Sequence, residues 1–163
     1  MSAFILNVSD LLGHPGARRT VALEAPLDIR LDLASVVEPV FADLVLEATV
    51  DEVVARGTLR ITASLRCNRC LAEWDDEMSV AILEVFGARP VDDGPIVERD
   101  GSIDLEQILH DEASLALPIA PLCRPDCLGL CPTCGTDLNT DPCSGHADES
   151  ASPFGALRYL LEP

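Results

Sequence analysis

The chain has 163 residues, 48% of them hydrophobic, which is typical of one compact domain with at most a small appendage. It contains no apolar run of about 18 residues, the length that a transmembrane helix needs, and residues 1–7 lack the features of a secretory signal. We therefore expect a cytoplasmic protein without membrane contact, whose cysteines stay reduced and serve as metal ligands or redox groups.

The net charge is −17, from 28 acidic and 11 basic residues, and every basic residue is an arginine. A protein this negative repels a polyanion at long range. The charge therefore disfavours non-specific binding to nucleic acid and favours a basic protein as partner. Contact with RNA would require a local basic surface.

The first predicted elements along the chain are short. Residues 9–12 could open a helical turn, and residues 13–16 are predicted to form a loop because of their glycines and proline. Thr20 to Glu24 is predicted to be a short strand.

Strict alternation of apolar and polar residues from position 57 to position 67 predicts a half-buried strand. Its apolar positions are Gly57, Leu59, Ile61, Ala63, Leu65 and Cys67. A similar upstream face consists of Leu44, Leu46, Ala48 and Val50, and a less regular downstream face of Val80, Ile82 and either Glu84 or Val85. Three consecutive strands with short connections favour an antiparallel sheet or a small open barrel.

A loop and one main helix are predicted next. Residues 89–101 are rich in proline, glycine and charge, as loops are. Helical spacing of apolar residues then predicts a helix at about 104–117, with Asp104 as N-cap and Gln107 three residues later. Pro118 is expected to end this helix.

A short terminal helix is predicted after Ser152, with Pro153 at its first position. Its apolar side would consist of Leu157, Leu160 and Leu161. The expected fold class is therefore α+β. Residues 1–120 would form a β-rich domain, and residues 121–163 a cysteine-rich zinc-knuckle segment with the terminal helix packed on it.

Five of the seven cysteines lie between positions 123 and 143, a density that needs a chemical reason in a reducing compartment. The core Cys-Pro-Thr-Cys-Gly at residues 131–135 supplies one. Two residues between cysteines let both sulfurs face one ion, and the following glycine permits a left-handed turn that aims N–H groups at the thiolates. We predict a structural Zn²⁺ here. The predicted ligands are Cys127, Cys131, Cys134 and Cys143, with Cys123 as an alternative to Cys127 and His146 as an alternative to Cys143.

Cys67 and Cys70 form a second, isolated Cys-x-x-Cys pair at the end of the predicted strand. Such a pair can be half of a zinc site, a thiol–disulfide redox centre or simple packing. A redox centre usually lies at a helix N-terminus in a βαβ setting, which is missing here. The pair could also join the metal site if the C-terminal segment folds back.

No catalytic constellation is recognisable in the sequence, so we expect neither an enzyme nor a small-molecule substrate. In this otherwise acidic chain, four arginines lie close together in sequence: Arg56, Arg60, Arg66 and Arg69. The first three share one face of a strand. They could pair across strands with Glu47, Glu52 or Glu84, or they could form a stripe that contacts RNA phosphates.

Two motifs give the chain a resemblance to a known family. Residues 65–71 read Leu-Arg-Cys-Asn-Arg-Cys-Leu, and residues 127–135 read Cys-Leu-Gly-Leu-Cys-Pro-Thr-Cys-Gly, followed by Asp137, Leu138, Asn139 and Cys143. The chain resembles the bacterial YceD family of large ribosomal RNA subunit accumulation proteins, in its branch with C-terminal cysteines. Where that branch usually ends in Cys-x-Cys, this chain has Cys143-Ser144-Gly145-His146, which strengthens the case for His146.

The resemblance implies a role in 23S ribosomal RNA accumulation and large-subunit assembly. A non-enzymatic factor of this kind would bind a basic ribosomal protein, a 23S ribosomal RNA precursor, or both. Two alternatives stay open: a thiol–disulfide oxidoreductase using Cys67 and Cys70, and a zinc-stabilised interaction module unrelated to ribosomes.

Overall fold

A computed structural model of the chain describes residues 3–87 and 94–146. It contains six strands and one helix in these ranges. In chain order they are β1 (Ile5–Asn7), β2 (Arg18–Ala25), β3 (Ala34–Ala48), β4 (Glu52–Arg66), β5 (Glu73–Gly87), β6 (Ser102–Asp104) and α1 (Glu106–Ala116). No helix within the described ranges is long and apolar enough to cross a membrane.

The main sheet has four antiparallel strands in the order β2-β3-β4-β5, so each strand pairs with its neighbour in sequence. β3, β4 and β5 have 15 residues each. At about 3.3 Å per residue, these strands are roughly 50 Å long. β2 and β5 are the edges, so the predicted antiparallel sheet is confirmed, and it does not close into a barrel in the part of the chain described.

One face of the sheet is buried, and the alternation predicted from position 57 to position 67 is confirmed. Leu59, Ile61, Ala63, Leu65 and Cys67 are all buried. The prediction for Val50 is wrong: its side chain is 76% exposed, because it lies in the turn between β3 and β4.

The predicted downstream strand corresponds to β5, and alternate residues of β5 face the core. Ile82 and Phe86 are buried, whereas Val85 is 40% exposed. The face of β5 that packs on the core therefore includes the position of Glu84, and Val85 lies on the opposite face.

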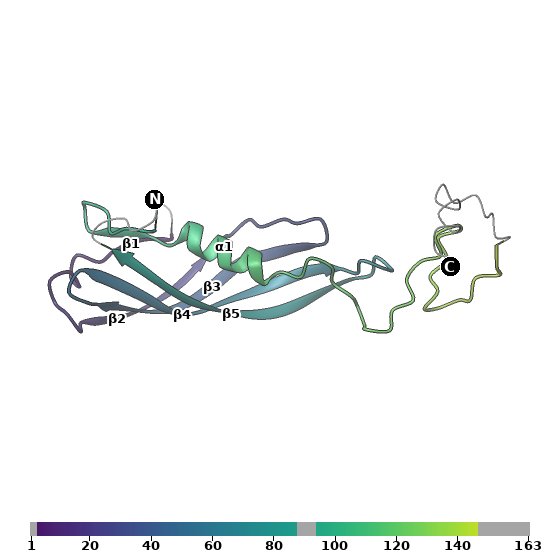
Figure 1. The fold of residues 1–163 in the computed structure, drawn as a ribbon, viewed down its shortest axis with the longest axis horizontal. Helices are drawn as coiled ribbons and strands as arrows, with labels where there is room; N and C mark the ends of the chain where they lie inside the picture. Colours follow the sequence, from purple (N-terminus) through teal and green to yellow (C-terminus); the bar gives the residue numbers. More distant parts are fainter. Residues whose placement is uncertain (1–2, 88–93, 147–163) are drawn as a thin grey trace, which may run out of the picture.

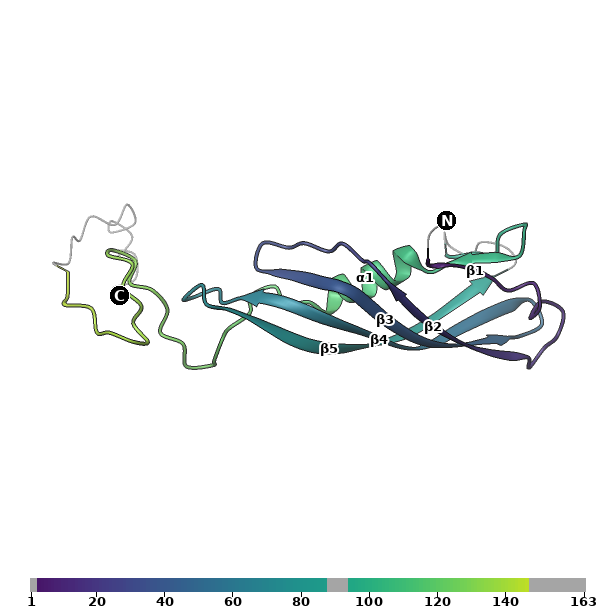
Figure 2. The same ribbon diagram turned by 180° about the vertical axis from the view of Figure 1, so that it is seen from behind.

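Helix α1 and the two-stranded sheet β1-β6 cover the buried face, as Figure 1 and Figure 2 show. The apolar stripe of the helical segment consists of Leu105, Leu109, Ala113 and Leu117, and all four are buried. Packing this stripe on the sheet buries one common core.

The ends of α1 differ in detail from the prediction. The helix is confirmed, but Asp104 ends β6 and Leu105 occupies the N-cap position. The carboxylate of Asp104 still accepts a hydrogen bond from the Glu106 N–H at 2.9 Å, whereas the Gln107 side chain donates to Asp111. The predicted reciprocal capping box therefore does not form.

After α1 the chain passes the turn between β4 and β5 and continues beyond that end of the sheet (Figure 1). This path brings residues 121–146 next to a turn that precedes them by more than 50 residues. The predicted terminal helix and residues 89–93 of the predicted loop lie outside the described residues.

Gly57 provides a test of the close contact between β3 and β4. A Cβ atom at this position would overlap the carbonyl oxygen of Asp43 and lie 2.9 Å from the Cα atom of Leu44. We expect Gly57→Ala to lower the free energy of unfolding by about 1–3 kcal/mol, because the two strands must shift to accept the methyl group. Urea unfolding followed by Trp74 fluorescence measures this change.

The matched control is Thr58→Ala, the next residue of β4, which lies on the outer face of the sheet. We expect its effect to stay below about 1 kcal/mol. Equal losses for the two variants would show that the approach of β3 to β4 does not limit this position.

Candidate metal centres

The turn between β4 and β5 has the hydrogen bonds of a knuckle that could hold a metal ion. The Cys67 N–H donates to the Ala72 carbonyl at 2.8 Å, and the Leu71 N–H donates to the Cys67 carbonyl at 3.0 Å. The N–H groups of Arg69 and Cys70 lie 3.4 and 3.5 Å from the Cys67 sulfur. These amides are placed to stabilise a thiolate.

The turn at Cys131 has the same pattern. The Cys131 N–H donates to the Thr136 carbonyl at 2.8 Å, and the Gly135 N–H donates to the Cys131 carbonyl at 2.9 Å. The residue after the second cysteine has a left-handed backbone in both turns, with φ of 62° at Leu71 and 74° at Gly135. The two Cys-x-x-Cys pairs are therefore equivalent structural units.

The first knuckle belongs to a cluster of four sulfurs, which we call the proximal cluster. Its members are Cys67, Cys70, Cys123 and Cys127, whose sulfurs all lie within 4.8 Å of one another. The Cys67–Cys127 and Cys70–Cys123 sulfur pairs are 3.8 and 3.6 Å apart. Cys67 and Cys127 are fully buried, so half of the cluster is shielded from water.

The second knuckle belongs to a distal cluster, which consists of Cys131, Cys134, Cys143 and His146. The Cys143 sulfur is 3.8 Å from that of Cys134, 3.7 Å from that of Cys131 and 3.0 Å from His146 Nε2. Each cluster thus offers four donor atoms, enough to hold one metal ion.

The structure divides the predicted quartet of Cys127, Cys131, Cys134 and Cys143 between the two clusters. Cys127 belongs with Cys67 in the proximal cluster, and His146 takes the fourth position of the distal cluster in addition to Cys143. This corrects the quartet, and the physical reason is that the C-terminal segment folds back on the β4-β5 turn. The sequence held a usable signal: seven cysteines and the nearby histidine make eight donors, or two sets of four.

Backbone contacts fix the C-terminal segment on the first knuckle. The Asn68 N–H donates to the Pro121 carbonyl at 2.8 Å, and the Leu130 N–H donates to the Arg69 carbonyl at 3.1 Å. The Arg69 guanidinium in turn donates to the Cys127 carbonyl at 2.8 Å. Gly129 passes directly over Arg69, where a Cβ would lie 3.1 Å from the Arg69 oxygen.

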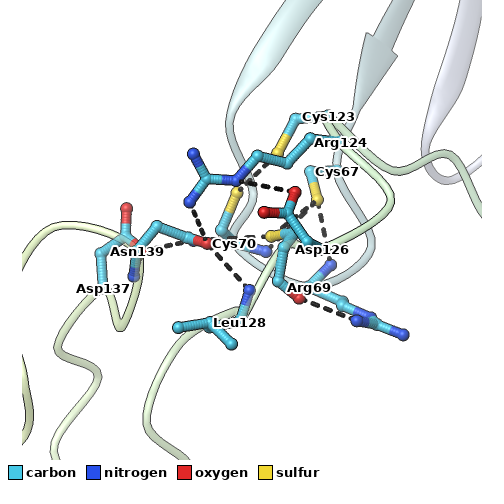
Figure 3. Close-up of polar contacts among 10 residues, drawn as sticks. Cys67, Arg69, Cys70, Cys123, Arg124, Asp126, Leu128, Asp137 and Asn139 are labelled. Carbon is cyan, nitrogen blue, oxygen red and sulfur yellow. Dashed lines mark hydrogen bonds and ion pairs between the residues drawn. The ribbon is translucent and has the colours of Figure 1, made fainter.

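Asn139, from the distal loop, also reaches the proximal cluster (Figure 3). Its Nδ2 donates to the Cys127 sulfur at 3.5 Å and to Asp137 Oδ1 at 2.6 Å. Its Oδ1 accepts from the Leu128 N–H at 2.8 Å and from Arg124 Nη2 at 2.7 Å. Sequence reasoning singled out this asparagine only as part of a family motif.

The thiol pKa values show that each cluster favours some ionisation but resists full ionisation. Burial opposes ionisation of Cys67, but hydrogen bonds from the backbone of Cys123, Cys70 and Arg69 outweigh it and lower its pKa to about 6. Loss of hydration and the neighbouring sulfurs raise the pKa of Cys123 to about 12. A divalent cation would relieve the mutual repulsion of four such sulfurs.

The distal cluster likewise contains both a thiol with a lowered pKa and a thiol with a raised pKa. Hydrogen bonds with the hydroxyl and backbone of Thr136 lower the pKa of Cys134 to about 6. The pKa of Cys143 is raised: a backbone hydrogen bond at Gly145 opposes the change, but loss of hydration and the nearby sulfurs outweigh it. Contact with the Cys134 and Cys131 thiols raises the pKa of His146.

The predicted arginine stripe is largely engaged within the protein. Arg56 lies 3.2 Å from Glu47, which also binds Arg18, and Arg60 pairs with Asp43 at 2.8 Å. Arg66 donates to the Asp32 carbonyl at 2.8 Å. The pairing of Arg56 with Glu47 is one of the cross-strand pairs considered from the sequence.

Comparison with known proteins places these clusters in context. The model of the family described as "Large ribosomal RNA subunit accumulation protein YceD" matches residues 55–161, a range that includes both clusters. An uncharacterized protein of Mycobacterium leprae is 32% identical over 176 residues, covering 100% of this chain and 80% of the relative. An uncharacterized protein of Mycobacterium tuberculosis H37Rv is 32% identical over 174 residues, covering 99% and 83%. No solved structure matched the chain.

The hydrogen bond between Cys134 and Thr136, with Sγ and Oγ1 3.2 Å apart, can be tested by thiol reactivity. Because the thiolate is the reactive form, we expect alkylation of Cys134 in metal-free protein to reach half its maximal rate near pH 6. Thr136→Val should move this midpoint towards the ordinary pKa of 9.0. Mass spectrometry of the alkylated peptides measures the rate at each pH.

Thr140→Val is the matched control, because the Thr140 hydroxyl donates to the Asp137 carbonyl and not to a sulfur. Its midpoint should equal that of the unmodified protein. An unmodified midpoint near 9, or no effect of Thr136→Val, would contradict the assigned contact.

Proposed function

The chain belongs to the YceD family, and from that premise we propose that it supports 23S ribosomal RNA accumulation by binding a basic ribosomal protein during large-subunit assembly. In this proposal the protein acts in the cytoplasm and without catalysing a reaction. The family match is the observation that carries the ribosomal role, and the charges of the described surface favour a protein partner.

The acidic surface of β5 supports a basic partner. Glu73, Asp75 and Glu77 lie on the outer face of β5 and Asp76 lies on the other face, but all four are exposed. None of them forms an ion pair within the described residues. β5 is also an edge strand. With a net charge of −17, such a surface attracts a cationic protein segment and lowers its tendency to bind RNA elsewhere.

Direct binding of RNA by the arginine stripe is the less favoured version. A phosphate would have to compete with Glu47 for Arg56 and with Asp43 for Arg60. The surrounding negative charge opposes the approach of a polyanion.

The surroundings of Cys67 and Cys70 argue against a thiol–disulfide oxidoreductase. Cys67 is fully buried, whereas an attacking thiol must be accessible to its substrate. Both sulfurs also face cysteines of the C-terminal segment, at 3.8 and 3.6 Å.

We further propose that the ion in each cluster is Zn²⁺ and that its role is structural. For Zn–S bonds of about 2.3 Å, a tetrahedron places its sulfurs about 3.8 Å apart. The sulfur pairs named above lie 3.6 to 3.8 Å apart. Four protein donors in each cluster leave no open position for a substrate, as is usual for structural zinc.

Metal analysis tests this assignment. We expect about two zinc ions per chain in protein purified under reducing conditions, and about one in either Cys70→Ser or Cys134→Ser. Each substitution removes one of four ligands from a single cluster. Elemental analysis by mass spectrometry gives the ratio of zinc to protein.

Asn68→Ala and Thr133→Ala change the interior of the same two knuckles without removing a ligand, and both should retain two ions. A single ion in the unmodified chain, or two ions in either serine variant, would contradict the assignment.

Affinity capture from growing cells tests the ribosomal role. The tagged full chain should enrich one basic ribosomal protein, and RNase treatment should not release it. The yield should fall between about 0.1 M and 0.5 M salt, because screening weakens attraction between exposed charges. Replacing Asp75 and Asp76 with Asn and Glu77 with Gln should reduce the yield further.

The control removes the same number of charges elsewhere, by Glu24→Gln, Asp51→Asn and Glu98→Gln. Enrichment of large-subunit RNA that disappears with RNase would support direct RNA contact instead. Absence of both ribosomal RNA and ribosomal proteins at low salt would contradict the ribosomal role and favour an unrelated zinc-stabilised module.

A further inference from the structure

Asn139 lies in the loop of one cluster, but its side chain contacts the other cluster. In sequence it stands between Cys134 and Cys143, two ligands of the distal cluster. Its Nδ2 donates to the sulfur of Cys127, a ligand of the proximal cluster, at 3.5 Å. The side chain thus provides a direct polar link between the distal loop and the proximal cluster.

The position requires an amide. The oxygen of Asn139 accepts from the Leu128 N–H and from Arg124, and its nitrogen donates to Asp137 and to the Cys127 sulfur. An aspartate could accept the first two bonds, but it has no donor for sulfur and would add a negative charge beside a thiolate. An N–H group directed at a metal-bound sulfur stabilises the thiolate and orients it.

The backbone reinforces the link between the sites. Cys127 and Cys131 are separated by residues 128–130, a connection too short to move independently of either cluster. The Leu138 N–H donates to the Gly129 carbonyl at 2.9 Å, and the Leu130 N–H donates to the Arg69 carbonyl at 3.1 Å. The connection is therefore held by the distal loop on one side and by the first knuckle on the other.

We propose that Asn139 is a positioning residue that couples the two metal sites, so that zinc in either cluster raises the affinity of the other. The distal ion orders the loop that carries Asn139, and Asn139 then holds Cys127 ready for the proximal ion. By linkage, the proximal ion strengthens the distal site by the same factor. This inference depends on zinc binding by both clusters, and it is independent of the ribosomal role.

The test measures the occupancy of each cluster separately in the full chain. Zinc is buffered at a series of free concentrations, and protection from alkylation is read at Cys70 for the proximal cluster and at Cys143 for the distal cluster. In Cys134→Ser, which breaks the distal site, we expect the zinc affinity of the proximal cluster to fall about 5- to 150-fold. In Asn139→Ala we expect a fall of about 10- to 100-fold at the same cluster.

The double variant distinguishes coupling from a local structural role. If Asn139 transmits the effect, Cys134→Ser should change the proximal affinity little once Asn139→Ala is present. If the losses of proximal zinc affinity caused by Cys134→Ser and by Asn139→Ala multiply in the double variant, the proposal is overturned. A proximal affinity unchanged by Cys134→Ser would also overturn it.

Two further variants guard against loss of the loop structure. Asn139→Asp keeps the acceptor for Leu128 and Arg124 but removes both contacts that Nδ2 donates, to the Cys127 sulfur and to Asp137. A loss of proximal affinity in this variant therefore points to the amide N–H groups and not to the acceptor contacts of the loop. Asp141→Asn, two residues later, should bind zinc as the unmodified chain does. If two zinc ions bind and the affinity of each cluster is independent of the other, only the coupling is overturned. If the chain binds no zinc, the zinc proposal is overturned as well.

Discussion

The structure depends on the meeting of four sulfurs from two distant parts of the chain. Cys67 and Cys70 lie in the turn between β4 and β5, and Cys123 and Cys127 belong to the segment that follows α1. Four thiols at this spacing resist full ionisation in the absence of a cation, as the opposite pKa shifts of Cys67 and Cys123 indicate. A bound ion would therefore hold the C-terminal segment on the sheet, in a region that has few other buried residues.

The two halves of the molecule differ in the interactions that can stabilise them. The sheet and α1 bury a continuous apolar core, with Phe86, Leu109 and Ile103 fully buried. The described C-terminal segment is too short for a core of this kind. Its buried residues are Pro121, Cys127, Gly129 and Cys131, and the two cysteines are both candidate metal ligands. The buried core and the candidate metal ligands thus meet at the β4-β5 turn, which belongs to both.

Sequence reasoning succeeded where the signal was local and failed where it was not. The alternation before Cys67 identified a strand, because a period of two follows from strand geometry alone. The partner of Cys67 could not be identified in this way, since Cys127 lies 60 residues away. The first knuckle was also harder to recognise because a leucine, Leu71, adopts the left-handed conformation after its second cysteine. In the second knuckle this position is a glycine, Gly135, the residue type that usually indicates such a conformation. Val50 extended the apolar alternation of β3 into a turn, where no partner strand covers it.

The 60 residues between Cys67 and Cys127 have a consequence for biosynthesis. A ribosome delivers the chain from its N-terminus, so the first knuckle leaves the exit tunnel well before the cysteines that complete its cluster. During that interval the nascent sheet presents two unpaired thiols. An ion held by all four sulfurs would consequently be bound only after residues 123–127 have emerged, and it would mark a chain that has reached this stage.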